Sequence, residues 1–204
     1  MGIEIKVTPV RELFFNEENF FGIYGCDVHP DYMNEIKFNR WGNISIKGVM
    51  PKLNLKEEYV VVVKEDTGSQ YEGSYIAESV KQERPTTIAE QKAFLEAILT
   101  PTQVKNIYEV YGENEDVVGM IERGEFDYSK VHGIGQKTFE KLQEKVMSNL
   151  DMSEVLAFLS KYGIKYNMIA KLVNEYKNPQ IVIQKIEENP YVLTEVKGIG
   201  FKKA

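Results

Sequence analysis

The tripeptide Gly-Ile-Gly occurs twice in this chain, at residues 133–135 and again 65 residues later at 198–200. Glycines permit a tight turn and leave room for a ligand to approach the backbone. Where such a turn opens a helix, the unpaired N–H groups of the first helical turn can receive a phosphate. Lysines follow each tripeptide and add positive charge. This pattern predicts binding to the phosphate backbone of a nucleic acid, without sequence preference.

The flanks of the two tripeptides repeat at the same offset, so that Tyr111 corresponds to Tyr176 and Ile121 to Ile186. Each copy predicts a short helix, a glycine hairpin and a lysine-bearing helix. The predicted DNA-binding residues are those of the two hairpins and the helix starts behind them: Gly133, Ile134, Gly135, Lys137, Thr138, Lys141, Gly198, Ile199, Gly200, Lys202 and Lys203.

Residues 131–138 resemble the hairpin of the helix-hairpin-helix module, in which the apolar residue between the glycines anchors the turn in the core. The alternative interpretation is a purely structural helix–helix turn, but two copies in matched context favour DNA contact. The second copy is the better match because it ends in the small residue Ala204, where the first has Phe139. Phe139 predicts looser or different packing. Two further hairpin-like places, around Thr100 and Gly163, lack one or both glycines, and we expect structural roles there.

Five runs rich in β-branched and aromatic residues precede residue 83, and turn residues separate them. They predict a small closed barrel of the OB-like kind. From Arg84 onward the apolar periodicity becomes helical. The predicted fold class is therefore α+β, with an OB-like barrel domain at 1–83 and an all-α domain at 84–204. The second domain carries tandem helix-hairpin-helix motifs, the last of which is truncated at residue 204. Because a helix that has only begun cannot bury its face, we expect an N-terminal piece of a longer polypeptide.

Composition restricts the mode of binding. The 204 residues carry a net charge of −6, so a protein that binds DNA over its whole surface is excluded and any contact must be local or weak. Cys26 is the only cysteine, which excludes an intrachain disulfide and suits a reducing compartment. The chain has neither a signal peptide pattern nor an apolar stretch long enough to span a bilayer. We expect a cytoplasmic protein with no membrane partner.

The sequence gives little support for nucleotide hydrolysis, metal binding or catalysis. In residues 133–138, Gln136 stands where a Walker loop needs lysine after glycine, so we expect no nucleotide hydrolysis by this segment. Residues 26–31 contain one cysteine, one histidine and two aspartates, too few soft ligands for a tetrahedral metal site. No catalytic residue is assigned. The barrel aromatics could stack bases, but a core role is favoured for them: Phe14, Phe15, Phe20, Phe21, Tyr24 and Trp41.

Several stretches together resemble the N-terminal region of the long-form RecD-like superfamily 1 DNA helicases, which are similar to the α subunit of exonuclease V. The resemblance covers nearly the whole chain. Its residues are 15–20, 71–80, 84–87, 107–112, 131–135, 188–193 and 198–202. The stretch Asn189-Pro190-Tyr191, followed by Gly198-Ile199-Gly200-Phe201, is the most specific part. Phe21 departs from the pattern, since glycine is usual there.

This resemblance implies an accessory DNA-binding region of a 5′→3′ helicase that acts in DNA repair or recombination. It implies no cofactor for the segment itself, since ATP and Mg²⁺ belong to the absent motor. DNA is the expected partner, and a repair or single-strand-binding protein could dock on the barrel. Two other functions stay open. One is a Holliday-junction-binding protein of the barrel-plus-helix-hairpin-helix type, and the other is a protein-interaction scaffold with structural hairpins.

Overall fold

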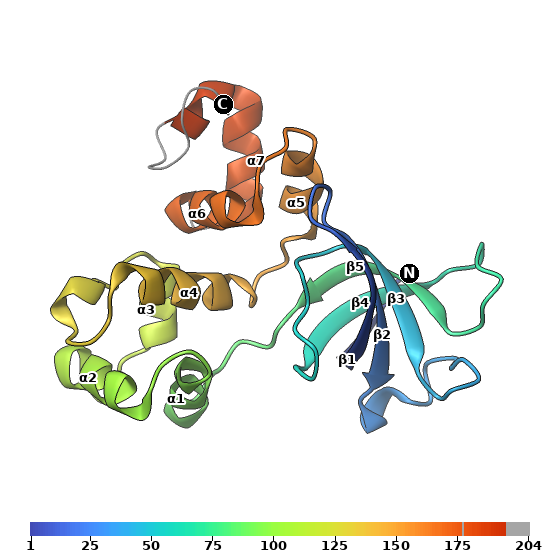
Figure 1. Ribbon diagram of the computed structural model, residues 1–204, viewed down its shortest axis with the longest axis horizontal. Coiled ribbons are helices and arrows are strands. Elements are labelled where there is room, and N and C mark those ends of the chain that lie inside the picture. The colour runs from blue at the N-terminus through green and yellow to red at the C-terminus, as the bar shows by residue number, and fades with distance from the viewer. Residues whose placement is uncertain (177, 195–204) are drawn as a thin grey trace.

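The computed structural model describes residues 1–176 and 178–194. An N-terminal barrel is followed by a helical region, and the two lie side by side (Figure 1). The predicted α+β class, with a small barrel followed by helices, is confirmed. The residue boundary that we place between 83 and 84 stays a prediction.

Five strands form the barrel: β1 Ile3–Asn16, β2 Phe21–Val28, β3 Ile44–Val49, β4 Tyr59–Glu65 and β5 Ser74–Lys81. They close in the order β1-β2-β3-β5-β4, with β1 antiparallel to β4. β3 and β5 are parallel, and the other neighbours are antiparallel. This topology places the β1–β2 and β3–β4 connections at one end of the barrel. The β2–β3 and β4–β5 connections lie at the other end.

Buried and accessible residues alternate along β3 and β4, so that every second side chain fills the interior of the barrel, as a closed sheet requires. Tyr24 is fully buried, and its hydroxyl accepts a hydrogen bond from the Leu53 N–H and donates one to Glu12. β1 is longer than the alternation in the sequence indicates, and it has two irregularities, between Pro9 and Arg11 and between Glu12 and Phe14. Such bulges bend a strand and let it follow a small barrel.

Seven helices follow in the described residues: α1 Ile88–Glu96, α2 Pro101–Tyr111, α3 Val117–Glu122, α4 Gln136–Met147, α5 Ser153–Ser160, α6 Tyr166–Tyr176 and α7 Pro179–Glu188. Short 3-10 turns lie at 30–32, 128–130 and 190–194. The starts of α1 and α2 precede those of α5 and α6 by the same 65 residues that separate the two tripeptides. The repeat therefore begins at α1, earlier than the sequence alone indicates. Within the described residues, no helix has the length and apolar character of a membrane span.

The helices form two hydrophobic clusters, one within α1–α4 and one formed by α5–α7 together with Met147 at the end of α4 and the 190–194 turn. We call these parts the first and second helical units. Phe20, at the tip of the β1–β2 connection, belongs to the cluster of the second unit and contacts the ring of Tyr166. Gln82, just after β5, donates its backbone N–H to the Ser148 carbonyl oxygen at 2.7 Å. The barrel is thus joined to the second helical unit by packing and to the α4–α5 connection by hydrogen bonds.

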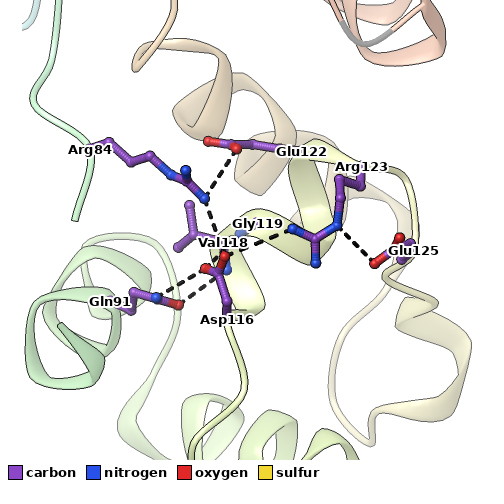
Figure 2. Close-up of polar contacts among 8 residues, drawn as sticks. All are labelled: Arg84, Gln91, Asp116, Val118, Gly119, Glu122, Arg123 and Glu125. Carbon is purple, nitrogen blue, oxygen red and sulfur yellow. Dashed lines mark hydrogen bonds and ion pairs between the residues drawn. The ribbon is translucent and has the colours of Figure 1, made fainter. Parts of the chain in front are cut away.

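A polar network around Asp116 braces the first helical unit (Figure 2). Asp116 caps α3 and accepts a hydrogen bond from the buried Gln91 side chain of α1. Arg84, in the exit segment of the barrel, forms ion pairs with both Asp116 and Glu122 at 3.3 Å. A Cβ at Gly119 would lie 2.1 Å from an Asp116 carboxylate oxygen, so a side chain there would displace that carboxylate from its place in the network.

Candidate nucleic-acid interface

The hairpin at residues 131–135 joins α3 to α4 through the 3-10 turn at 128–130. Val131 and Ile134 are buried in the first helical unit, while the two glycines are exposed. Gly133 has a φ of +88°, a conformation that favours glycine. The predicted anchoring role of Ile134 follows from this burial, because its side chain fixes the turn while the glycine backbone faces solvent.

Gly135 is the N-cap of α4 and makes no side-chain capping hydrogen bond. The first backbone bond of the helix runs from the Phe139 N–H to the Gly135 carbonyl oxygen at 3.0 Å. The amides of Gln136, Lys137 and Thr138 therefore precede the hydrogen-bond ladder, which leaves donors for an anion. A Cβ at Gly135 would meet nothing within 4 Å. The space above these amides is open.

Lys137 and Lys141 are exposed on α4, and neither forms an ion pair among the described residues. Their spacing of four residues places both on one face of the helix. The structure thus brings together six of the predicted site residues: Gly133, Ile134, Gly135, Lys137, Thr138 and Lys141. The other five, Gly198, Ile199, Gly200, Lys202 and Lys203, lie outside the described residues.

The turn around Thr100 has a supporting role. Thr100 and Gln103 form a capping box, with the Gln103 N–H donating to the Thr100 hydroxyl and the Thr100 N–H to the Gln103 side chain. Pro101 has no N–H at all. The start of α2 therefore uses its own side chains to satisfy its donors and offers few to an anion.

Gln103 and Asn106 position the neighbouring hairpin, a role that the sequence analysis missed. The Gln103 side-chain amide donates to the Gly133 carbonyl oxygen at 2.6 Å, and that of Asn106 donates to the His132 carbonyl oxygen at 3.0 Å. These bonds hold the 131–135 hairpin against the start of α2. The glutamine at the third position of a capping box was a readable signal for the cap, but only the fold shows that it bridges to Gly133.

Phe139 packs in an aromatic cluster. Its ring stacks on those of Phe126 and Tyr128, with centroids 5.7 and 4.9 Å apart. Tyr111 adds a contact to Phe126, and its hydroxyl donates to the Asp127 carbonyl oxygen and accepts from the Asp127 N–H. The packing at Phe139 is therefore different from that of a small residue, and the stacked rings support the segment that leads into the hairpin.

A third hairpin, at residues 161–165, joins α5 to α6. Gly163 has a φ of +66° and Ile164 is buried, so one glycine and the apolar anchor are retained. This hairpin lines a cleft of about 1210 Å³ between the barrel and the two helical units. Lysines and glutamates both line the cleft: Glu17, Glu18, Lys52, Glu57, Lys141, Glu144, Lys145, Lys161 and Lys165. Because the charges are mixed, the lining of the cleft does not favour an anion.

The residues considered as metal ligands do not assemble. Cys26 is fully buried in the barrel, where burial raises the pKa of its thiol to about 12. In the described part of the chain, histidine, cysteine and carboxylate side chains form no group of three or more that could hold a metal ion.

The six barrel aromatics are buried, partly buried or exposed, and Phe21 is among the partly buried ones. Phe20 and Tyr24 are buried, in agreement with the core role predicted for them, and Phe15 packs partly against both the barrel core and the second helical unit. Phe14 and Trp41 are exposed, so the expectation of a core role was wrong for them.

Comparison with known proteins agrees with the architecture. Residues 148–204 match the family model described as the ATP-dependent RecD2 DNA helicase HHH domain. This segment contains the second helical unit with its hairpin at 161–165. No solved structure matches the chain. The matched helical segment and the five-stranded barrel together fit an N-terminal RecD-like region without motor domains, as the sequence predicted.

Proposed function

We propose that this chain is a DNA-binding accessory region of a RecD2-type helicase and that it binds DNA through backbone phosphates without sequence preference. The family match supports the accessory role, since helix-hairpin-helix domains typically bind DNA. The parent enzyme would unwind DNA 5′→3′ in repair or recombination, with ATP and Mg²⁺ bound by its motor.

The observation that carries the proposal is the contrast between two neighbouring helix starts. α4 begins at an uncapped glycine with open space above its first amides. α2 begins with a closed capping box and directs Gln103 to the carbonyl oxygen of Gly133. The start of α4 thus has free donors for an anion, and the start of α2 supports the hairpin that precedes α4. A purely structural turn does not require the first to be left open.

The test is duplex binding by Gly135→Leu, measured by fluorescence anisotropy of a labelled oligonucleotide. The open space predicts that the side chain fits without disturbing the fold, while it covers the amides that receive the phosphate. Wild-type affinity should be micromolar or weaker at physiological salt, as for non-specific binding. The variant should lose at least about tenfold if it removes one phosphate site, since charge-assisted hydrogen bonds contribute about 1.5–3 kcal/mol.

A matched pair of lysine variants tests the electrostatic part. Lys137→Ala should weaken binding severalfold and reduce the slope of log K against log salt by about 1. Lys64→Ala removes the same charge from an exposed position in β4 and should leave duplex affinity unchanged. If Gly135→Leu remains folded and binds like wild type, the hairpin is a structural turn and the scaffold interpretation holds. A preference for four-way junctions over linear duplex would instead favour the junction-binding alternative.

A further inference from the structure

Trp41, the only tryptophan of the chain, lies at the end of the barrel opposite to the helical units. It belongs to the β2–β3 connection, which faces away from the helices (Figure 1). Its side chain is 71% exposed, and the Arg40 guanidinium lies 4.1 Å from the ring centroid. The exposed ring has one flat face next to a cation and is accessible to a stacking partner.

The loop that carries Trp41 is held by hydrogen bonds. Asn39 is its centre: the side-chain oxygen accepts from the Trp41 N–H at 2.9 Å, and the carbonyl oxygen accepts from the Gly42 N–H at 3.0 Å. The Asn39 N–H donates in turn to the Asn43 carbonyl oxygen at 2.9 Å. These bonds fix the backbone of the turn on which the exposed ring is placed.

A second exposed ring lies on the adjoining loop. Tyr71, in the β4–β5 connection, is 72% exposed. The two loops touch at Gly73, where a Cβ would lie 2.5 Å from the Asn39 backbone nitrogen. Tyr71 and Lys37 border a shallow hollow of about 230 Å³. Two rings and a guanidinium thus share one end of the barrel, on loops that are fixed against each other.

Most lysines and acids around this surface are paired with one another. Lys37 pairs with Glu65 at 2.8 Å and Lys47 with Asp66 at 2.5 Å, while Glu72, which also lines the hollow, forms no ion pair among the described residues. Arg40 has no ion pair among the described residues, so its charge is available to a phosphate. Polar and charged side chains line most of the hollow, whereas a proline-rich peptide needs an apolar aromatic groove.

From these observations we infer that Arg40, Trp41 and Tyr71 form a base-stacking platform for single-stranded nucleic acid. Bases of a single strand stack on the rings, and a phosphate lies against the Arg40 guanidinium, as in other sequence-tolerant strand binders. The platform is separate from the α4 hairpin, which receives phosphates only. It goes beyond the proposed function, because it adds an unpaired strand as a second ligand at the opposite end of the barrel.

Because Trp41 is the only tryptophan, its fluorescence reports directly on the platform. Titration of the whole chain with a single-stranded oligo-dT should quench the emission, and a blunt duplex of equal length, whose bases are already stacked, should quench it much less. Tyr71→Ala and Arg40→Gln should each raise the dissociation constant about 5- to 100-fold, the range expected for loss of one stacked base. Leu13→Ala, which removes exposed apolar surface from β1, should change nothing.

Trp41→Ala and Trp41→Phe complete the test by anisotropy of labelled oligo-dT. The phenyl ring should retain most of the affinity that alanine loses. Gly135→Leu should leave the quenching of Trp41 intact, which separates this proposal from the hairpin. The proposal is overturned if oligo-dT does not quench Trp41, or if Trp41→Ala binds single strands as tightly as wild type. Quenching by a proline-rich peptide at lower concentration than by oligo-dT would also overturn it and would assign the surface to a protein partner.

Discussion

At the scale of single residues, Gly133 and Gly135 have different functions although the sequence presents them as a pair. Gly133 has a positive φ, so glycine is required for the turn. Gly135 has an ordinary φ of −97° with open space where a side chain would be, so the fold does not require glycine there. A position that tolerates a side chain structurally but carries none is consistent with a ligand that approaches the backbone.

The two glycines predict opposite results in unfolding experiments. Gly133→Ala should reduce the free energy of unfolding by about 1–2 kcal/mol, since a Cβ is unfavourable in the left-handed region. Gly135→Ala should leave it unchanged or raise it by up to about 1 kcal/mol, because alanine restricts the unfolded chain. Urea unfolding of both variants measures the difference. Equal destabilisation by the two substitutions would mean that the conformation of the hairpin requires glycine at both positions.

Cys26 should be inert in the folded protein. Its thiol is fully buried, and burial raises the pKa to about 12, so almost no thiolate is present at pH 8. Ellman's reagent should label less than one tenth of the native protein in the time that labels all of the urea-unfolded protein. Rapid stoichiometric labelling of the native protein would show that the barrel opens at this strand.

At the scale of elements, the start of α2 supports the hairpin that precedes α4. Gln103 has two functions, since its oxygen caps the Thr100 N–H and its amide donates to Gly133. Thr100→Ala should remove the cap alone and cost about 1 kcal/mol of stability. Gln103→Ala should cost a similar amount and also weaken duplex binding severalfold, because the hairpin loses its brace. If both variants bind DNA like wild type, the brace is not needed for the site.

The Arg84–Asp116–Glu122 network predicts a pH dependence (Figure 2). Burial raises the pKa of Glu122, with Asp116 adding to the shift and Arg84 opposing it. A carboxyl group whose pKa is higher in the folded state favours folding below its unfolded pKa. That contribution is lost as the pH rises through the folded value. At neutral pH the charged Glu122 side chain therefore destabilises the folded state.

Glu122→Gln should accordingly be as stable as wild type at pH 7 or more stable, by less than about 1 kcal/mol since the group is partly solvated. The advantage should shrink as the pH falls through the raised pKa of Glu122 toward the ordinary value of 4.5, because the wild-type carboxyl group then takes up its proton. Urea unfolding at the two pH values measures this. A variant that is clearly less stable at pH 7 would show that the ion pair with Arg84 outweighs the burial.

At the scale of the whole molecule, the barrel and the second helical unit share a core through Phe20. This residue is 3% exposed and has a φ of +58°, which is rare for a bulky side chain. Packing against the helices must therefore compensate for a strained backbone. The arrangement fixes one end of the barrel to the helices and leaves the other end, with Trp41, open to solvent.

Phe20→Ala should reduce stability by about 3 kcal/mol or more, as for other buried phenylalanines. Because Phe20 joins the barrel to the second helical unit, the loss of its ring should increase hydrogen exchange mainly in α5–α7. Phe14→Ala is the matched control on β1, where a half-exposed ring should cost less than about 1 kcal/mol. Similar losses from the two variants would show that Phe20 does not join the two parts.

The sequence determined by itself the elements and the position of the candidate hairpin. The alternation of apolar residues located all five strands, the change of period at Arg84 marked the passage to helices, and the repeated Gly-Ile-Gly located the hairpin before α4. These features depend on local patterns of burial and backbone freedom, which a sequence records directly.

Only the tertiary structure decided how those parts are used. The bond from Gln103 to Gly133 joins residues 30 positions apart, and the loop that carries Trp41 contacts the β4–β5 connection where Gly73 lies against Asn39. The same residue types are found in cores and on binding surfaces, so composition could not separate Trp41 from Tyr24. Both outcomes depend on contacts between segments distant in the sequence, and these are fixed only when the barrel closes and the helices pack.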